Sequence, residues 1–389
     1  MTRAGWATLV VSGTLLATGY ALAYPELLAL AVAGLVVLGL GAVAVSGRPR
    51  VELEREIRPL RVTRGEPCVG VLTVKNLSTA RRLRVDAFEP CAGNGVDTQV
   101  AIAVPTLPRG GTRQATYRLP TARRAVLDVG PLRWERADPF GLWRRRQQLG
   151  TLERMHVHPR VHVLDLAASG RARHLDGPTS DTAPRGSITF HALREYVRGD
   201  DMRHVHWKSS ARLQTLMVKE HVDTALPHTT VLFDTRASAY DTAERFEEAV
   251  DLVASLLTAS TRSQFPCRLV TSAGVSMEAK GSHEETRAVL DLLSGVETSL
   301  DGGFLDMADA LDHRRSNSIV VCVTGALSGR EGEADLSAVR TLGRRYDRAL
   351  LVRLVPDGAP GVATGEEVVV VAAEDAAAAS LAWNIWSRR

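Results

Sequence analysis

The sequence has 389 residues, of which 45% are hydrophobic and 24% are charged. This length and composition leave room for two or three domains and exclude a wholly disordered or collagen-like chain. The formal net charge is +4, but basic residues are in excess over residues 51–150 and acidic residues over 151–389, which excludes a uniformly basic, nucleic-acid-binding surface. Four scattered cysteines without a C-x-x-C pair indicate buried thiols instead of a disulfide scaffold or a thiolate zinc site.

The first 50 residues contain two apolar runs, 6–24 and 27–45, separated by Pro25-Glu26. Each run has about 19 residues and, at roughly 1.5 Å per residue, is long enough to cross a hydrocarbon core of about 30 Å. A secretory signal peptide is the competing interpretation of the first run, but the second run follows at once, without a cleavage site before a polar segment. We predict a two-helix transmembrane anchor over residues 1–50.

The charged residues that flank these runs predict the orientation of the anchor. Arg3 precedes the first run, Arg48 and Arg50 follow the second, and the connecting turn has no lysine or arginine. The positive-inside rule then places both termini in the cytoplasm. We expect a two-pass protein of the plasma membrane, with the lipid bilayer as a partner and residues 51–389 as a cytoplasmic body.

Residues 51–150 show short alternating apolar patterns between turn residues. Strands are predicted at 69–75, 83–88 and 112–119, and their spacing is typical of a small antiparallel β-sandwich. The excess of arginine has two interpretations, a solvated face beside an anionic leaflet or a site for lipid phosphates, and the first is favoured. Residues 136–143 combine Asp, Pro and Gly and are predicted to form a structural turn, not a site.

Residues 151–228 are predicted to link this β-domain to the last domain. Within them, residues 169–187 are rich in Ser, Gly, Pro, Arg and Asp, which predicts an exposed loop. Residues 190–212 contain arginines, carboxylates, histidines, a tyrosine and a tryptophan at unusual density. Such a density indicates a buried ion-pair network or a binding surface, and we expect the ion-pair network to be the first role.

Three parts of this segment resemble the signature of the domain-of-unknown-function 58 (DUF58) family of bacterial proteins: Leu-Arg-Glu-Tyr at 193–196, Gly-Asp-Asp at 199–201 and Trp-Lys-Ser-Ser-Ala-Arg at 207–212. The anchor, the β-domain and its closing turn fit the same family. The chain departs from the family pattern at His206, where the family usually has Asp before the Trp. The resemblance marks these candidate binding residues: Arg194, Glu195, Tyr196, Gly199, Asp200, Asp201, Trp207, Lys208, Ser210 and Arg212.

The remaining residues, 229–389, alternate short apolar runs with helical patterns. Residues 229–234 are typical of a buried parallel strand, and apolar residues at helical spacing follow over 246–257. The alternation predicts a doubly wound α/β sheet, in which the loops at the carboxyl ends of the strands, beginning with Asp234, are the default place for a ligand. The family resemblance implies that this domain is similar to the von Willebrand factor A fold.

A von Willebrand factor A domain commonly holds Mg²⁺ through an Asp-x-Ser-x-Ser loop. The corresponding loop here keeps Asp234 and Ser238 but has Arg236 between them. Phe304 stands where a threonine ligand is expected, and Thr324 where a carboxylate is expected. Since Mg²⁺ needs hard oxygen ligands and Arg236 can itself pair with Asp234, we treat Asp234 and Ser238 as positions of a degenerate metal loop and expect no bound metal or other cofactor.

Histidines offer a second kind of metal chemistry. His156, His158 and His162 share a parity that would place them on one face of a strand, as do His204 and His206. Zinc can use such a set, but a proline interrupts the first group and no carboxylate or thiolate lies at helpful spacing. The sequence also has no nucleophile elbow, P-loop or G-x-G-x-x-G motif, and the carboxylates among residues 194–212 disfavour nucleic acid as a partner.

These patterns favour a membrane-anchored cytoplasmic scaffold or adaptor without enzymatic activity. The family resemblance implies a MoxR-type AAA+ ATPase as its partner, and a transglutaminase-like membrane protein as a further associate. The alternative function is a metal- or His-dependent hydrolase that uses the Asp234 loop. The expected architecture is multidomain: a two-helix transmembrane hairpin, a small antiparallel β-sandwich, a linker with the family signature, and a doubly wound, von Willebrand factor A-like α/β domain.

Overall fold

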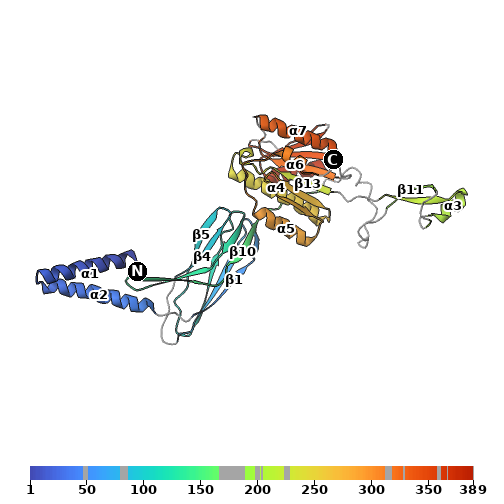
Figure 1. Ribbon diagram of the computed structural model, residues 1–389. Helices are drawn as coiled ribbons and strands as arrows, with labels where there is room; N and C mark the ends of the chain where they lie inside the picture. The colour runs from blue at the N-terminus through green and yellow to red at the C-terminus, as the bar shows by residue number, and fades with distance from the viewer. Residues whose placement is uncertain are drawn as a thin grey trace. The chain divides into compact units, whose positions relative to one another are not determined.

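The computed structural model divides the chain into two compact units (Figure 1). One consists of Met1–Arg160 and Leu290–Glu297, and the other of Val161–Val289 and Thr298–Arg389. The predicted loop at residues 169–187 lies outside the residues that the structure describes. Those are residues 1–46, 51–78, 86–165, 189–197, 202, 205–222, 228–311, 318–326, 329–356, 361–365 and 367–388.

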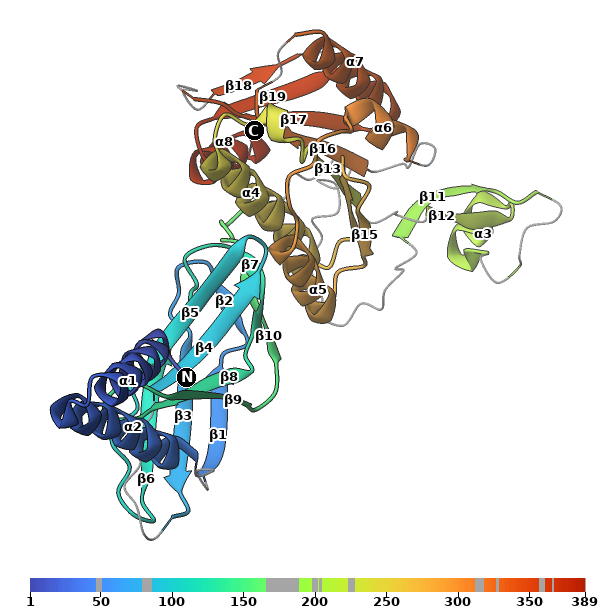
Figure 2. The ribbon, with the colours of Figure 1, turned by 60° about the vertical axis from the view of Figure 1, so that its left-hand side comes forward.

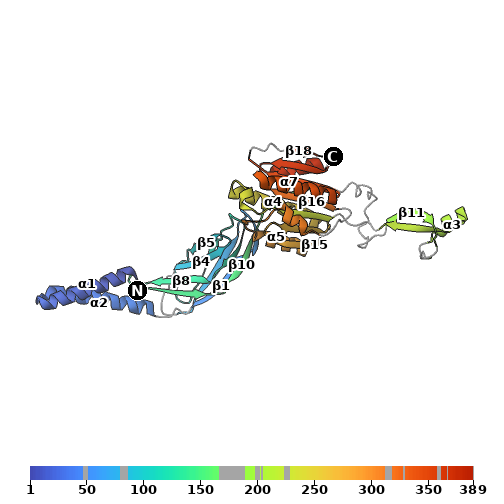
Figure 3. The same ribbon diagram turned by 45° about the horizontal axis from the view of Figure 1, so that its top comes forward.

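Two helices open the first unit: α1 (Arg3–Ala21) and α2 (Pro25–Ser46) run side by side as an antiparallel pair (Figures 1 and 3). They approach closely where the buried Ser12 meets Gly34, because a Cβ atom on Gly34 would lie 2.2 Å from the Ser12 Oγ. Within the described residues, α2 is the one helix long and apolar enough to cross a membrane, with a mean hydropathy of 2.7. The number of membrane spans stays a prediction.

Two β-sheets follow and pack face to face as a sandwich (Figure 2). The smaller sheet is antiparallel, in the order β1 (Val51–Arg58), β3 (Val69–Asn76) and β6 (Thr112–Arg118). The larger sheet has the order β2 (Arg61–Thr63), β10 (Glu153–His158), β7 (Ala125–Val129), β4 (Asp86–Gly93), β8 (Leu132–Ala137) and β9 (Arg144–Leu149), with β5 (Val96–Ile102) paired to β4. Its strand pairs are antiparallel except for β2 and β10. Because β10 belongs to this sheet, the sandwich continues past the predicted boundary at residue 150.

One core joins the two sheets. Leu72 of β3 and Trp134 of β8 are buried in it, as expected where alternate side chains of a strand face inward. A polar network crosses the same interior: Arg55 Nη1 donates to Glu89 Oε1 over 2.8 Å, and the Tyr117 hydroxyl donates to Glu89 Oε2 over 2.7 Å. Burial raises the pKa of Glu89. The predicted strand at 83–88 is described only from Asp86, where β4 begins.

The second unit is built on a seven-stranded sheet. Its order is β15 (Ser276–Ala279), β14 (Cys267–Thr271), β13 (His228–Phe233), β16 (Ser318–Thr324), β17 (Arg348–Leu354), β19 (Val368–Ala373) and β18 (Gly361–Thr364). The strands from β14 to β19 in this order are parallel, and the edge strands β15 and β18 are antiparallel to their neighbours. Both faces of the sheet are covered, which explains why the central strands are continuous apolar runs.

The helices of this unit lie in two layers (Figure 2). One face of the sheet carries α4 (Ala243–Arg262) and α8 (Ala376–Ser387), and the other carries α6 (Phe304–Asp309) and α7 (Gly329–Arg345). Adjacent residues of β13 show the division, since Phe233 stacks on Phe246 of α4 while Leu232 packs with Phe304 and Leu342 of the other layer. A further helix, α5, runs over His283–Ser294. The doubly wound arrangement predicted from the alternating pattern is therefore present.

A small hairpin precedes this sheet in the chain (Figure 3). Its strands β11 (Thr189–Glu195) and β12 (Met217–Val222) pair antiparallel, with a register shift between Phe190 and Ala192. The helix α3 (Trp207–Leu213) lies between them in sequence. The hairpin contains most of the family-like signature.

Candidate functional site

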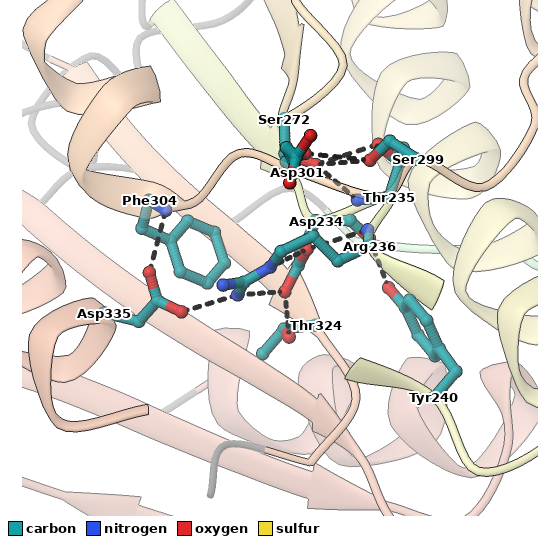
Figure 4. A network of polar contacts seen from close by, with 10 residues as sticks. All are labelled: Asp234, Thr235, Arg236, Tyr240, Ser272, Ser299, Asp301, Phe304, Thr324 and Asp335. Atoms are coloured by element: carbon teal, nitrogen blue, oxygen red, sulfur yellow. Dashed lines mark hydrogen bonds and ion pairs between the residues drawn. The ribbon is translucent and has the colours of Figure 1, made fainter. Parts of the chain in front are cut away.

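Strand β13 delivers Asp234 to the carboxyl edge of the sheet (Figure 4). Phe233 lies opposite Val323 of β16, so the residues that follow, Asp234 and Thr324, are neighbours in two parallel strands. The Thr324 hydroxyl donates to Asp234 Oδ2 over 2.8 Å, and both side chains are fully buried. Thr324 thus supports the carboxylate of Asp234.

Arg236 supplies the positive charge of this site. Its Nε donates to Asp234 Oδ1 over 2.9 Å and its Nη2 to Asp234 Oδ2 over 2.8 Å, which is the two-pronged geometry that a guanidinium makes with a carboxylate. The same Nη2 donates to Asp335 Oδ2 over 2.5 Å. These hydrogen bonds, with Asp234 the largest contributor, raise the pKa of Arg236. The pair between Arg236 and Asp234 that the sequence suggests is confirmed.

Asp335 is the member of the site that the sequence did not reveal. It is buried on α7, and its Oδ1 accepts the backbone N–H of Phe304 over 2.9 Å at the start of α6. Phe304 therefore contributes its amide and packs its ring in the core, where a threonine ligand was sought. The available signal was a lone carboxylate on an apolar helix face, because Asp335, Val339 and Leu342 recur at helical spacing and are all buried.

Two serine hydroxyl groups contact Thr235, the next residue of the loop. Thr235 Oγ1 lies 2.8 Å from Ser272 Oγ and 2.9 Å from Ser299 Oγ, and the Thr235 N–H donates to Ser272 Oγ over 2.9 Å. The hydroxyl of Tyr240 donates to the backbone oxygen of Asp234 over 2.6 Å, and burial raises the pKa of that hydroxyl well above its usual value. These contacts fix the loop between β13 and α4.

The degenerate metal loop is therefore occupied by an ion pair. Ser238 lies exposed in a short 3₁₀ helix, Ala237–Ala239, while both oxygens of Asp234 are engaged by Arg236 and Thr324. Among the described residues, no group of three or more His, Cys, Asp or Glu side chains is arranged to hold a metal ion. A divalent ion at Asp234 would have to displace a guanidinium that already supplies the countercharge.

The histidines on β10 form a second polar cluster. His158 Nε2 lies 2.7 Å from Asp291 Oδ1, and His156 Nδ1 lies 3.8 Å from the same oxygen. Arg61 holds Asp291 with hydrogen bonds of 2.9 to 3.1 Å. Burial lowers the pKa of His156. His162 does not join this face, because it lies beyond the strand and belongs to the second unit, where its backbone N–H donates to the Ser255 hydroxyl of α4 over 2.8 Å.

The described signature residues divide into supporting and exposed groups. The backbone N–H of Tyr196 donates to the oxygen of Leu216 over 2.8 Å, across the hairpin. Buried Ser210 links α3 to β12, since its hydroxyl donates to the His206 oxygen over 3.1 Å and accepts the Met217 N–H over 2.8 Å. These contacts give Tyr196 and Ser210 roles in shaping the hairpin.

The remaining signature residues form an exposed surface or lie outside the description. Glu195, Lys208 and Arg212 are exposed. Trp207 is 63% exposed. Gly199, Asp200, Asp201, His204 and the side chain of Arg194 lie outside the described residues, so the predicted ion-pair network stays a prediction.

His206 explains the departure from the family pattern. It occupies the N-cap position of α3, and its Nδ1 accepts the Ser209 N–H over 3.2 Å. Asp is among the residues most favoured at that position, because its carboxylate accepts the same backbone donor. In this chain the imidazole caps α3.

Comparison with known proteins identifies one family. Residues 192–354 match the family described as protein of unknown function DUF58, which covers the signature hairpin and the sheet through β17. No curated protein matches the chain. The matched residues make up less than half of the chain.

Solved structures are similar to this chain only distantly. A structural genomics target named SoR45 is 17% identical, with a TM-score of 0.19, over 28% of this chain and 85% of that one. A GH20 exo β-N-acetylglucosaminidase from Vibrio harveyi is 8% identical, with a TM-score of 0.18, over 87% and 37%. The pilus adhesin RrgA from Streptococcus pneumoniae is 10% identical, with a TM-score of 0.17, over 76% and 46%. The chain thus spans less than half the length of the last two.

Proposed function

We propose that this DUF58-family chain is a membrane-anchored cytoplasmic adaptor that binds a partner protein through the hairpin β11–α3–β12. The observation that carries the proposal is the apolar surface of that hairpin: Val197 and Trp207 are each 63% exposed and Leu213 is 59% exposed. Large apolar side chains exposed along one short segment of the chain are typical of protein-binding surfaces. The exposed cations Lys208 and Arg212 beside them suit a partner surface with carboxylates.

The partner proposed from the family resemblance is a MoxR-type AAA+ ATPase, with a transglutaminase-like membrane protein as a further associate. Tryptophan and arginine are over-represented among residues that dominate binding energy, and both occur on α3. In the proposed complex, the exposed ring of Trp207 enters a pocket of the partner. The cations of α3 set the orientation of the partner.

The proposal includes a von Willebrand factor A-like second unit that lacks the metal of that fold. Its support is the parallel strand β13, which is followed by Asp234, and Ser238 in the same loop. Arg236 replaces the metal as the countercharge. The hydrolase alternative requires a carboxylate at Asp234 that is free to bind a metal or activate water, whereas Arg236 and Thr324 engage both oxygens. The geometry therefore favours an adaptor over a hydrolase.

The anchor proposed is a two-pass hairpin in the plasma membrane with both termini in the cytoplasm. The apolar length of α2 supports it directly. In α1 the hydroxyls of Thr8, Thr14 and Thr18 each donate to the backbone oxygen four residues earlier over 2.9 Å. Because these hydroxyls are hydrogen-bonded within the helix, the free energy of transferring them into hydrocarbon is much lower than for unpaired hydroxyls.

Co-purification from detergent-solubilised membranes tests the adaptor function. The full chain is used as bait, and a non-hydrolysable ATP analogue holds the ATPase assembled. We expect a MoxR-type ATPase to co-purify with the wild type and with Leu381→Ala, an exposed apolar residue of α8 that serves as the matched control. Trp207→Ala should lose the ATPase. Equal recovery with Trp207→Ala would move the contact elsewhere, and a different class of protein in its place would overturn the partner.

A further inference from the structure

The turn between β8 and β9, residues 138–143, does more than close a hairpin. Asp138 folds it, because its side chain accepts the N–H groups of Phe140 and Trp143. The turn then contacts both N-terminal helices: the Trp143 indole N–H donates to the Leu38 oxygen of α2 over 2.9 Å, and the Thr2 N–H, at the start of α1, donates to the Leu142 oxygen over 2.9 Å. A stretch that the sequence predicts to be a structural turn is thus the joint between the helices and the sandwich.

Each helix has a glycine where the turn crosses it. A Cβ atom on Gly5 would lie 2.3 Å from the Leu142 oxygen, and one on Gly41 would lie 3.0 Å from Trp143 Cδ1 and 3.2 Å from Asp138 Oδ2. A contact of 2.3 Å is closer than atoms approach, so a side chain at Gly5 would push the turn away. The contacts at Gly41 are tighter than usual, so a side chain there would require the turn to shift slightly. Gly5 of α1 and Gly41 of α2 therefore both make room for the turn.

Two arginines close the end of α2. Arg136 Nη2 donates to the Ala44 oxygen over 3.0 Å, and Arg145 Nη1 donates to the Ser46 oxygen over 3.0 Å. The last carbonyls of a helix have no partner within the helix, and positive charge is favourable there. The strands on both sides of the turn thus hold α2 along its final turns.

The start of α1 places this joint at a particular depth. The turn contacts Thr2 and lies against Gly5, and in the proposed anchor this end of α1 lies at the cytoplasmic face of the bilayer. Tryptophan side chains are favoured in the interfacial layer there. Phe140 at the tip of the turn is 62% exposed, so its ring faces the surroundings.

The charge beside the tip suits an anionic leaflet. Arg144 and Arg146 lie on β9 immediately after the turn, and both pair with the single carboxylate of Glu135. Two guanidinium groups on one carboxylate leave a net positive charge at this end of the sandwich. Basic side chains near the cytoplasmic leaflet are attracted to its anionic lipids.

We propose that the tip of the turn, with Phe140 and Trp143, is inserted in the interfacial layer of an anionic phospholipid leaflet and holds the sandwich rigidly against the membrane. This inference rests on the proposed membrane anchor. It adds a third point of attachment to the two helices and makes the sandwich a fixed platform instead of a body that swings on a linker.

Depth-dependent quenching tests the inference. The four native cysteines, Cys68, Cys91, Cys267 and Cys322, are buried, so a thiol-reactive, environment-sensitive fluorophore will label an introduced surface cysteine selectively. The full chain with Phe140→Cys is labelled and reconstituted in vesicles of phosphatidylglycerol and phosphatidylethanolamine that contain nitroxide-labelled lipids. The matched control is Thr98→Cys, an exposed position on β5 of the same sandwich.

We expect a label at position 140 to lose more than half its emission to a nitroxide near the headgroup, and less to one deep in the acyl chains, whereas a label at position 98 is unaffected. Trp143→Phe, which removes the indole N–H, should weaken the quenching at 140. Absence of quenching at 140 in a protein that still resists carbonate extraction would overturn the inference and leave the anchor intact. Equal quenching in neutral phosphatidylcholine would overturn the anionic component. Release of the whole protein by carbonate would instead overturn the proposed anchor.

Discussion

Arg236 and Asp335 form a buried ion pair across 99 positions of the chain, with the guanidinium Nη2 against Asp335 Oδ2. Because Arg236 also holds Asp234, one guanidinium compensates two carboxylates and joins the loop after β13 to the helix α7. In a metal-dependent adhesion site a divalent ion would have this central position. Here Arg236, which is part of the chain, supplies the countercharge of both carboxylates.

Removing the guanidinium should destabilise the second unit strongly. Arg236→Ala leaves Asp234 and Asp335 buried without their cation, and breaking a buried pair in this way costs about 3–5 kcal/mol. We expect a clearly lower melting temperature, measured by differential scanning fluorimetry of the full chain in detergent. The control is Arg344→Ala, which breaks an exposed pair with Glu367 and should cost at most about 1 kcal/mol. Similar melting of the two variants would show that the buried pair contributes little.

Replacing the guanidinium by a hydroxyl should create a metal site. Arg236→Ser restores the serine of an Asp-x-Ser-x-Ser loop beside Asp234, Ser238 and Asp335, which are the oxygen donors that Mg²⁺ prefers. Millimolar Mg²⁺ should raise the melting temperature of Arg236→Ser relative to EDTA, because a ligand that binds only the folded state stabilises it. The wild type should show no such shift and no heat of binding in calorimetry. Binding by the wild type that Asp234→Ala abolishes would instead revive the metal-dependent hydrolase.

How much of this site the sequence predicts depends on how far apart its residues lie along the chain. The apolar run of β13, the carboxylate after it and the competing Arg236 lie within a few residues, so local patterns are sufficient to predict them. Asp335 reaches the site only because α7 packs on the same face as α6, and no local pattern carries that information. The turn at 138–143 is similar. Asp138 and Gly141 predict its conformation, but its packing against Gly5 and Gly41 depends on how the two helices pack on the β-sandwich.

The stability of the first unit should fall with decreasing pH through the titration of His156. Burial is the largest cause that lowers the pKa of this imidazole below 6.5, with Arg61 adding to it and Asp291 opposing it. The unfolded chain therefore takes up the proton first as the pH falls through 6.5, and the free energy of unfolding decreases until the folded pKa is passed.

The variant His156→Gln removes this contribution and keeps a neutral polar side chain. Urea denaturation of the wild type and the variant, between about pH 5 and pH 7.5 where histidines titrate, should show a shallower decrease in the variant. Stability that decreases equally in both proteins would show that His156 does not cause the pH dependence.

The N-cap of α3 gives the last prediction, because it connects the departure from the family pattern to the proposed binding surface. The His206 imidazole accepts the Ser209 N–H, and loss of an N-cap acceptor costs about 0.5–2 kcal/mol. In a helix as short as Trp207–Leu213 that loss should fray the first turn, which carries Trp207 and Lys208. We expect His206→Ala to speed amide hydrogen exchange at Ser209 and Ser210 and to weaken partner binding, while His206→Asp restores both. Since Asp also places a negative charge at the positive end of the helix, His206→Asp should protect these amides at least as well as the wild type. Faster exchange in His206→Asp than in the wild type would show that the imidazole is needed for more than capping.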